Sequence, residues 1–115
     1  MITAALLLFG CAALAGLALL TFLIGQKDRP WALVIGHGLL AVGGLATLAI
    51  AVAASGSALP IVALVLFLIA ASGGVALFVL HVRKRPLPVP LAGAHAFLAI
   101  VAIVLLLVYV AMRGM

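Results

Sequence analysis

The chain has 115 residues, of which 70% are apolar and 6% are charged, and its mean hydropathy is +1.64. A soluble domain of this size is never so apolar, because a small globule leaves much of its surface in water. The composition therefore excludes a soluble enzyme and predicts an all-α integral membrane protein. The net charge of +5 comes from a few residues between apolar segments and does not indicate nucleic-acid binding.

Four apolar segments follow one another along the chain, and none of them contains Asp, Glu, Lys or Arg. They cover about residues 2–25, 31–54, 59–82 and 89–112. At 1.5 Å per residue, each is long enough to cross about 30 Å of hydrocarbon as a helix. We therefore predict a single transmembrane domain over residues 1–115, a four-helix bundle with short connections that bury its apolar surface in the lipid bilayer.

The basic residues are concentrated in two of the connections. Five of the six lie in residues 26–30 and 83–88, whereas the middle connection and the amino-terminal flank have none. Because positive charge marks the cytoplasmic side of a membrane, we expect these two loops to be cytoplasmic and both termini to lie on the opposite side. The expected location is a cell membrane, the inner membrane in a bacterium.

An internal repeat appears when the chain is aligned with itself so that Met1 falls on Leu59. His37 then falls on His95, Gly16 on Gly74, and further pairs match, including Phe9 with Phe67, Pro30 with Pro88 and Leu40-Ala41 with Leu98-Ala99. Each unit contains two apolar segments. We therefore predict two tandem helical hairpins, residues 1–57 and 59–115, related by a pseudo-twofold axis along the membrane normal.

Histidines 37 and 95 lie level with each other inside the predicted helices. Each lies seven residues after a proline, Pro30 or Pro88, and therefore about 10 Å below the same edge of the membrane. In an antiparallel bundle with short loops the second and fourth helices are diagonal partners, about 11–14 Å apart. That separation suits two imidazoles with an iron ion between them, so both histidines are candidate axial ligands.

Small residues border the plane in which a haem would then lie, and basic residues stand near its predicted edge. Expected to give clearance are Gly16, Gly73, Gly74, Ala41 and Ala99. Possible contacts of the haem propionates are His81, Arg29, Arg83 and Arg85. We expect each axial histidine to bind iron through Nε2 and to donate its other N–H to a carbonyl four residues earlier, at Leu33 or Leu91.

Level histidines on diagonal helices, with Gly16 and Gly74 opposite His37 and His95, resemble the haem-binding bundles of b-type membrane cytochromes, including the cytochrome b561 class. The resemblance implies haem b, one-electron transfer, and a quinone or another membrane redox partner. This chain departs from the common two-haem pattern because the outer half of its bundle has no histidine. One haem near the cytoplasmic side is therefore expected.

Other interpretations of the same residues stay open. A cofactor-free accessory or scaffold subunit of a larger membrane complex would have a similar sequence, because Ala-x-x-x-Gly patterns and an intramembrane histidine also serve helix packing and homo- or hetero-oligomerisation. A zinc or copper site at the histidines is a third possibility. The one acidic residue, Asp28, lies in a loop, which disfavours a proton-coupled exporter. No motif of a self-contained enzyme is present.

Overall fold

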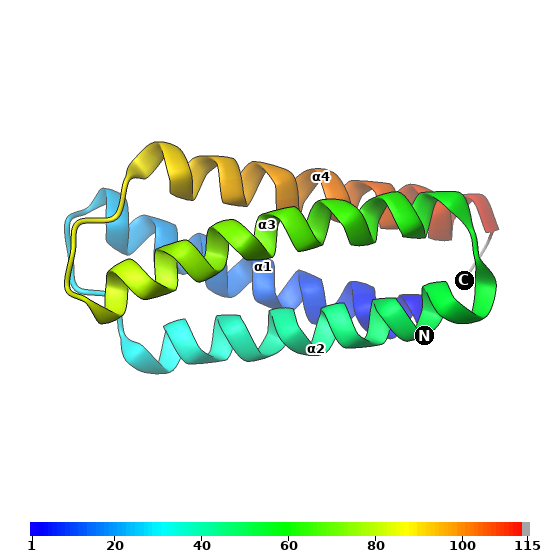
Figure 1. Cartoon of the computed structure of the whole chain (residues 1–115), viewed down its shortest axis with the longest axis horizontal. Helices are drawn as coiled ribbons and strands as arrows, with labels where there is room; N and C mark the ends of the chain where they lie inside the picture. The colour runs from blue at the N-terminus through cyan, green and yellow to red at the C-terminus, as the bar shows by residue number, and fades with distance from the viewer. Residues whose placement is uncertain (114–115) are drawn as a thin grey trace.

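The computed structural model describes residues 1–113 and shows an all-helical antiparallel bundle (Figure 1). Its helices are α1 (Ile2–Ile24), α2 (Trp31–Ser55), α3 (Ala58–Val82) and α4 (Val89–Arg113). The four segments predicted from hydropathy are confirmed to within one residue at every end. The last two residues of the predicted second repeat, 114–115, lie outside the described part of the chain.

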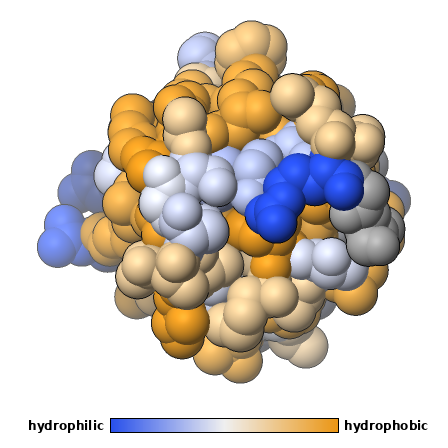
Figure 2. Space-filling model, turned by 90° about the vertical axis from the view of Figure 1, so that its right-hand side faces the viewer, coloured by the Kyte–Doolittle hydropathy of each residue, from blue (hydrophilic) through white to orange (hydrophobic). Residues whose placement is uncertain are grey.

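The composition explains why all four segments are helical. In hydrocarbon every backbone N–H and C=O needs a partner within the protein, and a helix supplies those partners inside one segment. The bundle is 43 Å long, and each of its helices is long and apolar enough to cross a bilayer. Apolar side chains encircle the end of the bundle where the termini lie (Figure 2). These features identify a membrane protein.

The helices are arranged so that each one packs against its neighbours in the chain, and α1 also packs against α4. Helices α1 and α3 form one diagonal pair, and α2 and α4 form the other, as predicted. The fully buried centre lies toward the terminal end of the bundle, where Leu48 of α2 and Leu106 of α4 are 0% exposed. The two histidines on α2 and α4 therefore lie across the bundle from each other.

The loops at the opposite end begin with the same helix-ending turn. Gln26 after α1 and Lys84 after α3 have positive φ angles of 56° and 55°. The N–H groups of Lys27 and Arg85 donate back to the carbonyls of Phe22 and Leu80, each over 2.9 Å. This is the Schellman arrangement, in which a left-handed residue closes the helix and satisfies carbonyls that would otherwise be unpaired.

Replacement of Gln26 by glycine is expected to stabilise the protein. A side chain with Cβ is strained at positive φ, so Gln26→Gly should raise the free energy of unfolding by about 1 kcal/mol. The measurement is thermal unfolding in mild detergent, followed by circular dichroism. Gln26→Val, whose branched side chain is worse at positive φ, should lower the melting temperature. A melting temperature lowered by glycine would contradict the role given to this turn.

Candidate functional site

His37 and His95 are each hydrogen-bonded to the other helix of their own hairpin. Nδ1 of His37 on α2 lies 2.7 Å from the Ala12 carbonyl oxygen on α1, and Nδ1 of His95 on α4 lies 2.6 Å from the Ala70 carbonyl oxygen on α3. The acceptors expected from the sequence, the carbonyls of Leu33 and Leu91, were therefore wrong. Both histidines reach across to the neighbouring helix, which links α1 to α2 and α3 to α4.

These bonds determine which ring nitrogen carries hydrogen. A carbonyl oxygen can only accept, so Nδ1 of each ring must be the donor. In the neutral imidazole Nε2 is then left with a free lone pair, which is the form that binds metal ions. Within residues 1–113, neither Nε2 has a hydrogen-bonding partner. The hairpins thus present two unpaired imidazole nitrogens.

The glycines opposite the histidines give space to the imidazole rings themselves. A Cβ atom built on Gly16 would lie 3.0 Å from Cε1 of His37, and one on Gly74 would lie 3.0 Å from Cε1 of His95. Gly73 is less critical, since its Cβ would lie 3.6 Å from Cβ of His95. The clearance predicted for a haem is, in this structure, occupied by the histidine side chains.

The carbonyl that accepts the histidine bond and the glycine that makes room for the imidazole ring lie one helical turn apart. Ala12 precedes Gly16 by four residues, so the carbonyl of Ala12 already points along the helix toward the amide of Gly16. Without a side chain at Gly16, the ring of His37 comes close enough to use the second lone pair of that carbonyl. The Ala-x-x-x-Gly pattern thus combines a hydrogen-bond acceptor with the room needed to reach it.

The two imidazole rings lie close to each other across the bundle. Their centroids are 6.1 Å apart and their planes meet at 81°. One metal ion bound to both Nε2 atoms at about 2.0 Å, with each nitrogen about 1.1 Å from its ring centre, would place the centroids roughly 6 Å apart. The two rings are therefore close enough to share one metal ion if both Nε2 atoms turn toward it.

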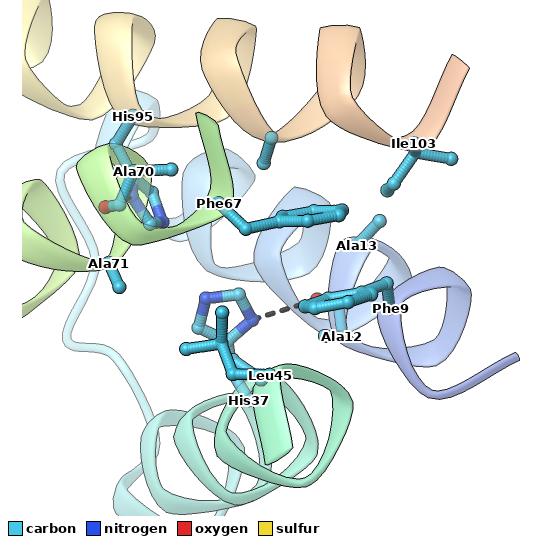
Figure 3. A pocket seen from close by; sticks show the side chains of 12 residues that line it. Phe9, Ala12, Ala13, His37, Leu45, Phe67, Ala70, Ala71, His95 and Ile103 are labelled. Carbon is cyan, nitrogen blue, oxygen red and sulfur yellow. Dashed lines mark hydrogen bonds between the residues drawn. The ribbon is translucent and has the colours of Figure 1, made fainter. Parts of the chain in front are cut away.

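Both histidines line one apolar cavity of about 70 Å³ (Figure 3). Ala41 and Ala99, predicted beside a haem, are part of its wall, and the other lining residues are Phe9, Ala12, Ala13, Leu45, Phe67, Ala70, Ala71 and Ile103. The rings of Phe9 and Phe67 stack 3.7 Å apart at an interplanar angle of 5°. Gly44 makes room for this stack, since a Cβ there would lie 2.9 Å from the ring of Phe9.

The donor atoms fit a haem iron, but the space in this structure does not fit the macrocycle. Pockets for ligands of that size measure about 300–1,000 Å³. The cavity of about 70 Å³ is large enough for an ion or a few water molecules. A macrocycle between His37 and His95 requires the two hairpins to stand further apart around the cavity than they do here.

The residues predicted to contact propionates do not line this cavity. Nε of Arg29 donates to Nδ1 of His81 over a long 3.4 Å, and the ring of Trp31 lies against His81 with centroids 4.4 Å apart. Arg83 and Arg85 are exposed. Within residues 1–113, no group of three or more His, Cys, Asp or Glu side chains is placed to hold a metal ion.

Several residues of the site were not assigned to it from the sequence. The carbonyls of Ala12 and Ala70 and the rings of Phe9 and Phe67 are the main ones. These residues form two pairs that match in the internal repeat, which was the one available signal. The repeat of these residues did not show that the alanines act through their backbone carbonyls and the phenylalanines through their rings.

Comparisons with known proteins leave the site to be interpreted from its own chemistry. No protein-family model matches the chain, and neither a curated protein nor a solved structure does.

Addition of a methyl group at Gly16 or Gly74 is expected to destabilise the bundle. Gly16→Ala or Gly74→Ala should push the imidazole off its carbonyl acceptor, with a loss of about 1–3 kcal/mol in the free energy of unfolding. The measurement is denaturant unfolding in detergent. Gly10→Ala on α1 is the matched control, because a Cβ there meets nothing within 4 Å. Equal changes in the free energy of unfolding for Gly10→Ala and Gly16→Ala would contradict the role of Gly16 in making room for the imidazole.

Proposed function

We propose that this chain is a membrane-embedded b-type haem protein in which His37 and His95 are the axial ligands of a single iron. The observation that carries the proposal is the pair of Nδ1-to-carbonyl bonds, which leaves two Nε2 lone pairs on rings 6.1 Å apart. Carbonyl acceptors of this kind fix the tautomer and orientation of ligating histidines. Two neutral donors at one depth in an apolar bundle are the ligand set of a bis-histidine haem.

The chemistry would come from the cofactor, and the protein would supply its ligands and surroundings. Two imidazoles fill both axial positions, so such a centre favours one-electron transfer over binding of oxygen. His37 belongs to one hairpin and His95 to the other, so the macrocycle has to lie between the hairpins. The proposal therefore requires that the hairpins part around the cavity when haem binds. Its redox partner would be a quinone or another membrane protein, within a homo- or hetero-oligomer.

The proposal extends to the symmetry and orientation of the chain. Both hairpins contain the same histidine-to-carbonyl bond, the same glycine beside the imidazole ring and the same helix-ending turn, at matching positions of the repeat. We infer a pseudo-twofold axis along the membrane normal, with the chain in a cell membrane. The basic loops 26–30 and 83–88 would be cytoplasmic and both termini would lie on the other side. Propionate contacts by Arg29, His81, Arg83 or Arg85 stay a prediction.

Optical spectra test the proposal directly. Protein expressed with added haem and purified in mild detergent is expected to show a Soret band and, after dithionite, sharp α and β bands. His37→Ala and His95→Ala should each abolish the bands or convert them to a five-coordinate form, whereas His81→Ala, which removes no iron ligand, should retain the six-coordinate form. A protein that stays colourless would overturn the haem proposal, and metal analysis of that protein would then test for a bare zinc or copper ion.

A scaffold subunit without a cofactor is the second candidate, and one observation favours it. Each histidine bond already joins the two helices of a hairpin, which is a sufficient structural use of the side chain. In a scaffold only Nδ1 matters. In a haem protein Nε2 is also needed, because it binds the iron. A variant that keeps the Nδ1 bond and lacks Nε2 should therefore stay intact as a scaffold but fail as a haem ligand.

Substitution by asparagine separates these two uses. The amide N–H of Asn takes roughly the place of Nδ1–H, so His37→Asn and His95→Asn should preserve the bond to Ala12 or Ala70 and lack Nε2. We expect a melting temperature within a few degrees of the haem-free parent protein and loss of the six-coordinate haem bands. His37→Ala, which leaves no donor, should be less stable than His37→Asn by about 1 kcal/mol. Six-coordinate haem bands retained by both Asn variants would contradict ligation by these histidines.

A further inference from the structure

A second cluster of polar side chains lies at the end of the bundle that carries the basic loops, away from the cavity. Arg29 of the first loop donates through Nε to Nδ1 of His81 near the end of α3. Trp31, the first residue of α2, packs edge-on against His81 and against Phe78, with centroid distances of 4.4 and 6.2 Å. The cluster thus joins the two hairpins at the edge of their apolar spans.

Hydrogen-bond donors in this cluster exceed the available acceptors. Because Nδ1 of His81 accepts from Arg29, the neutral ring carries its hydrogen on Nε2. That Nε2 is buried and has no partner within residues 1–113. In the same part of the chain, the Arg29 side chain makes one hydrogen bond, the bond to His81. The terminal N–H groups of the guanidinium and the ring N–H of His81 all lack an acceptor.

We propose that Arg29, held in place by its bond to His81, binds the phosphate of an anionic lipid headgroup, with Trp31 against the adjoining acyl chain. The guanidinium fork of arginine matches a phosphate with two parallel N–H donors, and its bond to His81 holds that fork in place. Trp31 and Val82 are 52% and 51% exposed, so the cluster opens toward lipid. Tryptophan at the end of an apolar span is typical of the headgroup level of a membrane.

The composition of the cluster gives one such site in each chain. His81 has Leu23 as its counterpart in the first repeat, and a leucine side chain cannot accept a hydrogen bond from an arginine. Arg83, Lys84 and Arg85 follow His81 closely and raise the local concentration of anionic lipids. These three are exposed and form a diffuse positive field, whereas Arg29 and His81 form a defined contact. This inference does not depend on whether haem is bound.

Trp31 is the one tryptophan of the chain and reports on the lipid beside it. The experiment reconstitutes the haem-free protein in phosphatidylcholine vesicles that contain a minor fraction of dibrominated phosphatidylglycerol or, in parallel, dibrominated phosphatidylcholine. Bromine quenches tryptophan emission on contact. We expect brominated phosphatidylglycerol to be enriched at Trp31 about fivefold over brominated phosphatidylcholine, the preference that one well-placed arginine provides.

Variants separate a defined site from a diffuse field. Arg29→Gln should reduce the enrichment to near onefold and His81→Leu should reduce it in part, whereas Lys27→Gln, which removes one charge from the same loop, should retain most of it. An equal loss of phosphatidylglycerol enrichment in Arg29→Gln and Lys27→Gln would contradict a defined lipid site. The absence of any enrichment in the parent protein would also contradict it. Loss of the enrichment on addition of inorganic phosphate at constant ionic strength would assign the site to free phosphate and overturn the lipid assignment. Circular dichroism of each variant confirms that it is folded.

Discussion

The bond between an imidazole N–H and a carbonyl of the facing helix is the constraint on which this bundle depends. A polar ring inside hydrocarbon is costly unless its donor is satisfied, and the nearest available acceptors are backbone carbonyls. Ala12 and Ala70 provide them, while Gly16 and Gly74 allow the rings to come close. Each hairpin is thereby fixed in register, and its free imidazole nitrogen is directed away from the carbonyl that holds the ring.

The space between the hairpins depends on the same arrangement. The centroids of the two imidazole rings are 6.1 Å apart. The neighbouring rings of Phe9 and Phe67 are stacked, with their centroids only 3.7 Å apart. The result is a small apolar cavity, and half of the residues that line it are alanines. A cavity of this size can hold an ion without any change in the packing of the helices. It could hold a macrocycle only after the two hairpins had moved apart. Any cofactor as large as haem would therefore couple its binding to the packing of α1 and α2 against α3 and α4.

Side-chain hydrogen bonds between different helices and loops lie at three levels of the bundle. The histidine pair lies within the apolar span, and the Arg29–His81 contact with Trp31 lies at the end with the basic loops. At the other end Tyr109 donates to Ser57 over 3.0 Å and accepts from Arg113, which ties α4 to the turn before α3. Side-chain contacts therefore join the helices at both ends of the bundle as well as at the cavity.

The four helices, their ends to within one residue, and the diagonal placement of His37 and His95 could be predicted from the amino-acid sequence. These follow from hydropathy, loop length and depth, which depend on local composition and on short connections. The tertiary structure decided which carbonyl each histidine binds, since the sequence favoured Leu33 and Leu91 and the structure shows Ala12 and Ala70. It also decided that Gly16 and Gly74 hold imidazoles, that two phenylalanines stack beside them, and that the cavity is small. Such contacts join residues on different helices, and their geometry depends on rotamers and helix rotation that no local pattern specifies.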